Sequence, residues 1–95
     1  MTRAAFTASL RASKPPADAP APLVALWHDA KGDWDAAHSV AQDIDDGTGA
    51  RIHAYLHRKE GDIGNAGYWY RRANETLFTG ALDEEWQALV ASLTE

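Results

Sequence analysis

The four histidines are the side chains best suited to metal binding or catalysis in this sequence, which contains no cysteine. His53 and His57 are four residues apart, so a helix would place both imidazoles on one face. His28 occupies the position equivalent to His57 in an internal repeat, and stacked repeats would bring it close. Three imidazoles, supported by Asp29 or Glu60, could ligate a zinc-like divalent cation at neutral pH. The sequence therefore offers a candidate metal or ligand site at His28, His53 and His57.

Two other interpretations of these histidines stay open. His28 and His57 could be half-buried packing residues that hydrogen-bond to the backbone or to an aspartate, as buried polar groups normally do. A histidine could also act as a general base that is oriented by Glu60 or Asp29. No serine or lysine nucleophile lies beside the histidines in a recognisable motif. The sequence therefore favours a protein without catalytic activity and without a cofactor, although it does not exclude an enzyme.

A second group of residues combines aromatic and basic side chains around the run Tyr68-Trp69-Tyr70. Such a group can stack nucleic-acid bases, or it can hold the carboxylates of a partner peptide through arginine. Alternatively, Tyr70 is a core residue, and the arginine stems lie across the other two rings. Arginine, tryptophan and tyrosine are the types enriched in interface hot spots. We predict partner-binding residues at Arg58, Lys59, Tyr68, Trp69, Arg71 and Arg72.

Charge and hydropathy exclude several classes of protein. The chain of 95 residues has a net charge of −5, which argues against a general nucleic-acid binder. Residues 15–49 are acidic and residues 50–75 are basic, a pattern that suggests intramolecular attraction or head-to-tail pairing in a homo-oligomer. No apolar run approaches the roughly 18 residues of a membrane span, and the first 30 residues lack the apolar region of a signal peptide. We expect a cytoplasmic protein.

The elements that must position these residues are helices. Apolar residues recur at helical spacing within residues 23–30, 34–44, 52–56, 63–73 and 86–93, with Asp83 as the expected cap of the last helix. No segment alternates with a period of two, so we predict no sheet. All four prolines lie within residues 15–22. We therefore predict an N-terminal arm at 1–14, a Pro/Ala linker at 15–22 and a single helical domain at 23–95. The arm is expected to be frayed, or docked through Phe6 and Leu10.

An internal repeat relates residues 25–44 to residues 54–73 at an offset of 29 without a gap. Both copies contain a Gly-Asp corner, at residues 32–33 and 61–62. An aromatic or apolar residue follows each corner, and then an alanine, at Ala37 and Ala66. This pattern resembles the turn and second helix of tetratricopeptide-type repeats. The segment from residue 53 to 73 also resembles small bacterial proteins of uncharacterised function, a similarity that implies no activity.

Together these observations predict an all-α domain of two stacked helical hairpins and a C-terminal capping helix. The resemblance implies a protein-interaction or self-association module, because two repeats are fewer than the three that usually form a stable array. The alternative is a small ligand- or metal-binding protein that uses the histidine cluster.

Overall fold

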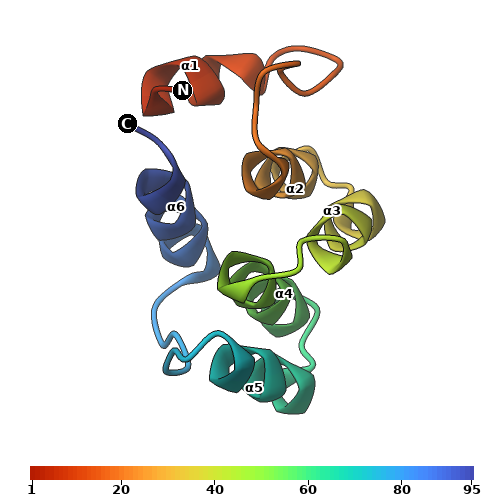
Figure 1. Ribbon diagram of the computed structural model, residues 1–95, viewed down its shortest axis with the longest axis vertical. Helices are drawn as coiled ribbons and strands as arrows, with labels where there is room; N and C mark the ends of the chain where they lie inside the picture. Colours follow the sequence, from red (N-terminus) through yellow and green to blue (C-terminus); the bar gives the residue numbers. More distant parts are fainter.

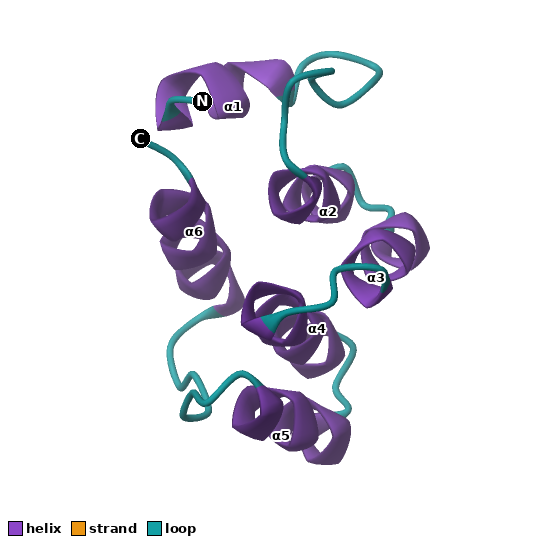
Figure 2. Cartoon of the chain, viewed as in Figure 1, coloured by secondary structure: helices purple, strands orange, loops and turns teal.

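The computed structural model describes residues 1–95 and contains six α-helices and no strand (Figures 1 and 2). The prediction of an all-α protein is therefore confirmed. The helices are α1 (Arg3–Ser9), α2 (Ala21–Ala30), α3 (Trp34–Gln42), α4 (Gly47–Lys59), α5 (Ile63–Arg72) and α6 (Leu82–Leu93).

The two Gly-Asp corners have the same local structure, in agreement with the sequence repeat. Gly32 and Gly61 have φ angles of 84° and 91°, the left-handed conformation that glycine adopts without steric cost. The next residue, Asp33 or Asp62, accepts a hydrogen bond from the backbone N–H three residues later and so caps the following helix. Each corner thus joins two packed helices, which we name the first helix pair (α2 and α3) and the second helix pair (α4 and α5).

The main core lies where α2, α3, α4 and α6 meet. Helix α4 packs against α3, α5 and α6, and α6 also packs against α2. Trp86 of α6 is buried, and its indole Nε1 donates a hydrogen bond of 3.1 Å to the carbonyl of Leu26 in α2. Helix α5 is held by a smaller apolar cluster of Ala54, Ala66 and Tyr70. The last helix therefore covers both α2 and α4.

The N-terminal arm is docked on the helical body. Phe6 of α1 has no exposed surface and belongs to the main core, and Leu10 packs against that core. The indole Nε1 of Trp27 donates a 3.1 Å hydrogen bond to the carbonyl of Ser9. At the other end of α1, the N–H of Glu95 donates to the carbonyl of Met1, so the two chain ends lie together (Figure 1). The arm shares a core with the residues predicted to form the separate domain.

Several predicted boundaries differ from the structure. The last helix begins at Leu82 with Ala81 as its N-cap residue, so the prediction that Asp83 caps it was wrong. Helix α2 begins inside the predicted linker. Helix α3 ends at Gln42, and Ile44 is half-buried in the connection that follows. Leu77, in the connection between α5 and α6, is 45% exposed.

The radius of gyration of the Cα atoms is 12.4 Å, close to the value of about 13 Å for a compact domain of 100 residues. None of the six helices has the length and apolar character needed to span a bilayer.

Candidate metal centre

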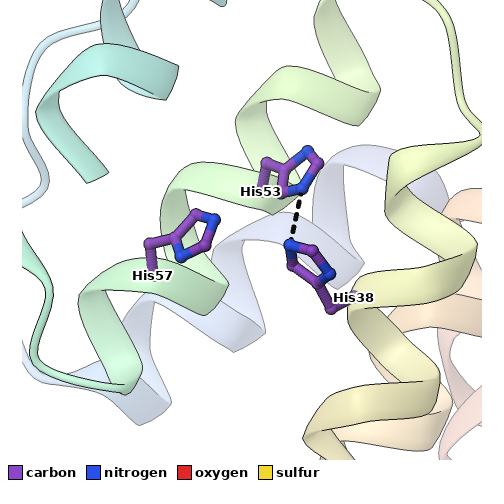
Figure 3. Close-up of side chains that lie close together, drawn as sticks. All are labelled: His38, His53 and His57. Carbon is purple, nitrogen blue, oxygen red and sulfur yellow. Dashed lines mark hydrogen bonds between the residues drawn. The ribbon is translucent and has the colours of Figure 1, made fainter. Parts of the chain in front are cut away.

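Three histidines from two neighbouring helices converge at the contact between α3 and α4. His38 lies on α3, and His53 and His57 lie one turn apart on α4 (Figure 3). Each ring offers one nitrogen to a group in which all ligand atoms lie within 4.8 Å of one another. His53 and His57 are 5% and 7% exposed, while His38 is half-buried. The group is thus held on rigid helices at a largely buried position.

The closest approach is between the Nε2 atoms of His38 and His53, which are 2.9 Å apart (Figure 3). Two neutral imidazoles at this distance share one hydrogen, since one ring must donate to the other. The same two atoms could instead direct both lone pairs at a cation. Zinc–nitrogen bonds of about 2.0–2.1 Å in a tetrahedral site place two nitrogens about 3.3 Å apart. A small opening of the pair would therefore make room for the ion.

Two tryptophan rings hold the histidine rings in place. Trp34 stacks on His38 with a centroid distance of 4.9 Å and an interplanar angle of 12°. Trp69 of α5 stacks on His53 at 4.1 Å and 15°. The indole Nε1 of Trp34 donates a 2.8 Å hydrogen bond to the carbonyl of Leu56, which fixes this ring against α4. The aromatic rings restrict the rotation of the imidazoles and keep water from two of their faces.

A carboxylate orients the third histidine. The Nδ1 atom of His57 lies 2.6 Å from Oε2 of Glu60, one helical turn further along the chain. With the Nδ1 hydrogen directed at this carboxylate, a neutral ring carries its lone pair on Nε2. The Nδ2 atom of Asn65 is 3.5 Å from that Nε2, a distance at the limit of hydrogen bonding. Metal-ligating histidines commonly have such a carboxylate partner, which sets the tautomer and the ring direction.

The surroundings favour unprotonated imidazoles at two of the three positions. Burial, together with the neighbouring His38 and His57, lowers the pKa of His53 to about 4. Burial and His57 also lower the pKa of His38, against an opposing effect of Glu60 and Asp35. Both rings are therefore neutral at pH 7. A metal ion requires neutral imidazole, so these two rings are ready to bind at that pH.

A second group of possible ligands shares one of these histidines. His57, Glu60 and Asp62 also have ligand atoms within 4.8 Å of one another, but both carboxylates are exposed. Exposed carboxylates near a helix corner are common without a metal ion. The group of three histidines has the more distinctive donor set.

His28, one of the three predicted histidines, is not part of the cluster. It lies at the end of α2, and its ring meets that of Trp27 edge-on at 5.2 Å. Asp29 is buried, is not part of the histidine group, and is bound by the hydroxyl of Tyr55 at 2.6 Å and Nζ of Lys59 at 2.8 Å. The structure thus brings together the predicted His53 and His57 with a histidine that the sequence analysis did not select, His38.

The six predicted partner-binding residues lie on two helices, and two of them, on α4, are bound within the chain. Arg58 is bound to the carboxylate of Glu85 and the carbonyl of Gly80, and Lys59 is bound to Asp29. The other four, Tyr68, Trp69, Arg71 and Arg72, lie on α5.

Three of the four residues on α5 contact one another. The guanidinium of Arg72 lies 5.4 Å and 5.8 Å from the ring centroids of Trp69 and Tyr68, and it donates a 3.0 Å hydrogen bond to the Tyr68 hydroxyl. Trp69 is half-buried because its other neighbour is His53. The aromatic and basic run thus contacts the histidine cluster.

Comparison of the chain with known protein families, with curated proteins and with solved structures finds no match. The fold and the side-chain geometry therefore carry the functional argument.

Proposed function

We propose that this protein binds one divalent transition-metal ion, zinc or a chemically similar ion, through His38, His53 and His57. The observation that carries this proposal is the convergence of three imidazole nitrogens within 4.8 Å from two packed helices. Lowered pKa values at two of the histidines and the carboxylate on His57 support it further. Histidines that only pack the interior do not need converging nitrogens, lowered pKa values and an orienting carboxylate at the same place.

The donor set indicates the class of metal. Imidazole nitrogens suit zinc, copper, iron and nickel, whereas magnesium and calcium prefer oxygen ligands. Three protein ligands leave a fourth tetrahedral position for water or for an external ligand. We therefore expect zinc(II) and cobalt(II) to bind and magnesium to compete poorly.

The ion would also join the two helix pairs. His38 belongs to the first helix pair, and the other two ligands belong to the second. We propose that the two pairs are stacked hairpins in the manner of tetratricopeptide-type repeats, with the ion as a cross-link between them. Such a cross-link would compensate for the small number of repeats, because binding energy at a site absent from the unfolded chain adds to stability.

The test is a zinc titration of the chelator-treated protein, followed by calorimetry and by thermal unfolding. We expect one ion per chain and a rise in the melting temperature. At a free zinc concentration 100 times the dissociation constant, the stabilisation would be about 2.7 kcal/mol. Cobalt(II) provides an independent optical measurement, since its absorption in the visible range reports the coordination number.

The fourth histidine provides a matched control. His38→Ala and His53→Ala should each weaken zinc binding by at least about 100-fold, whereas His28→Ala should leave it unchanged. Glu60→Gln removes the carboxylate from His57 and should weaken binding by about 10–100-fold. Equal zinc affinities for His38→Ala and His28→Ala would contradict the proposal, and so would the absence of binding by the unmodified chain.

A further inference from the structure

A second possible binding site lies at a cavity where α2, α4 and α6 contact one another (Figure 1). The cavity has a volume of about 410 Å³, at the lower end of the range of about 300–1,000 Å³ for ligand pockets. Tyr55 and Lys59 of α4 line it, and they follow His53 and His57 by two residues each. Two residues correspond to a rotation of about 200° around a helix, so the cavity and the proposed metal centre lie on opposite faces of α4.

A buried carboxylate forms one side of this cavity. Asp29 accepts a 2.6 Å hydrogen bond from the hydroxyl of Tyr55 and a 2.8 Å hydrogen bond from Nζ of Lys59. The aspartate lies in the last turn of α2, where the helix dipole disfavours a negative charge. Burying a carboxylate is also costly, and pairing it with a lysine often adds nothing over apolar residues in the same place. Local stability therefore does not account for an aspartate at this position, whereas a ligand in the cavity would.

The side chains around the cavity offer a ligand negative charge and hydrogen-bond acceptors. Two carboxylates, Asp29 and Asp83, and one ammonium, Lys59, give the lining a net charge of −1. Lys59 is bound to Asp29, whereas Asp83 has no ion pair within the chain. Burial, the hydrogen bond to Asp29 and the charges of nearby acids that include Asp83 raise the pKa of Tyr55, so its hydroxyl keeps the hydrogen that it donates. This hydroxyl can therefore only accept from a ligand, and a ligand with a positive charge and N–H donors fits the lining.

Apolar side chains form much of the remaining lining. Leu10 follows α1, and the exposed Leu82 and the buried Trp86 belong to α6. Nζ of Lys31 donates a 2.7 Å hydrogen bond to the carbonyl of Leu10, and this ammonium does not itself line the cavity. A ligand with an apolar part would remove the surfaces of the two leucines and the tryptophan from water.

From these features we infer that the cavity binds a small organic cation, a primary amine with a compact apolar or aromatic body. The ammonium group of the ligand lies beside Asp83 and the hydroxyl oxygen of Tyr55, and its body packs against Leu82 and Trp86. An anion of the same shape meets Asp83 as a like charge and should bind more weakly. The site is independent of the proposed metal centre, because none of the three histidines of that centre lines the cavity.

An NMR titration of the isotope-labelled full chain tests the inference, with chelator present so that an amine cannot bind to a metal ion instead. The probes are two amines, phenethylamine and hexylamine, and one anion of similar shape, hydrocinnamate. We expect one phenethylamine per chain with a dissociation constant below about 1 mM, and binding of hydrocinnamate at least about tenfold weaker. The indole N–H signal of Trp86 should shift, whereas that of Trp34, which lies at the histidine cluster, should not.

Two variants locate the site, and each has a matched control. Asp83→Asn should weaken phenethylamine binding by about threefold or more, because it removes the unpaired charge. Asp35→Asn should leave binding unchanged, since Asp35 is also exposed and is also the second residue of its helix. Leu82→Ala should weaken binding by about threefold or more through lost apolar contact. Leu77→Ala, which changes an exposed leucine outside the cavity, should have no effect.

Three results would overturn the inference. The first is that neither amine binds saturably at concentrations up to about 5 mM. The second is that hydrocinnamate binds as tightly as phenethylamine. The third is that Asp83→Asn and Asp35→Asn bind phenethylamine equally well. Zinc binding in calorimetry is a separate readout, so either proposal can fail without the other.

Discussion

Replacing Glu85 by alanine should lower the free energy of unfolding by about 3–5 kcal/mol. Glu85 has no exposed surface, and it lies 2.7 Å from Nη1 of Arg51 and 2.7 Å from Nη1 of Arg58. Its second oxygen also accepts a hydrogen bond from the hydroxyl of Tyr70, and burial together with this bond raises the pKa of the tyrosine. Removal of the carboxylate would leave two largely buried guanidinium groups without a counter-charge.

Urea unfolding followed by circular dichroism measures this loss. Gln87→Ala is the control, because it changes an exposed residue on the same helix and should alter stability by less than about 0.5 kcal/mol. Glu85→Gln keeps the shape of the side chain and removes its charge, so it separates the ion pairs from the packing. A loss below about 1 kcal/mol for Glu85→Ala would show that the arginines find other partners or reach water.

The metal-free protein should lose stability as the pH falls from 6.5 to 4. The pKa of His53 is about 4 in the folded state because of burial and the two neighbouring imidazoles, and it is near 6.5 in an unfolded chain. Between these values the unfolded chain binds a proton that the folded chain excludes, so acid favours unfolding. Each tenfold difference in proton affinity is worth about 1.4 kcal/mol, which gives a loss of up to about 3 kcal/mol from His53. His38, whose pKa is also lowered, adds to the loss.

Urea unfolding at a series of pH values, with chelator present, measures this dependence. His53→Phe keeps an aromatic ring against Trp69 and removes the titrating group, so its stability should depend less on pH between 5 and 6.5. His28→Ala should retain the dependence of the unmodified chain. The explanation fails if the unmodified chain and His53→Phe show parallel curves in this range, where few carboxylates titrate.

The local elements could be predicted from the sequence because their causes are local. The Gly-Asp corners require a left-handed glycine and a capping aspartate, and both are visible as residue types at fixed positions. The apolar stripes identified the helices for the same reason. The start of α6 was missed because Ala81 has no side-chain hydrogen-bonding group. The N–H of Ala81 is instead satisfied by the Oε1 atom of Glu84, at 3.2 Å.

The candidate metal site could be predicted only in part. His53 and His57 share a helix, so their common face follows from spacing alone. Their partner depends on which helix packs against α4, and the repeat suggested the equivalent position, His28. In stacked repeats, equivalent positions such as His28 and His57 lie one repeat spacing apart. His38 lies instead on α3, which contacts α4 directly. The spacing of Trp34 and His38, four residues apart on one helix, was the available signal.

The burial of Phe6 also depended on contacts between distant parts of the chain. A helix of seven residues is too short to be stable alone, so its order comes from the core that it joins. That core includes side chains of α2 and α6, which are distant in sequence from the arm. Composition showed the prolines between the arm and the body, but it did not show that the chain turns back at this point.

The contact of Trp86 with Leu26 implies an order in which the chain assembles. The two residues are separated by 60 positions, whereas each helix pair is joined by a short corner. Closing a long loop costs more conformational entropy than closing a short one, so we expect the helix pairs to form early and α6 to dock late. Interactions that form after the rate-limiting step govern how fast a protein unfolds. Glu85 lies on α6 and contacts α4 and α5. We therefore expect its contacts to lower the rate of unfolding more than they raise the rate of folding.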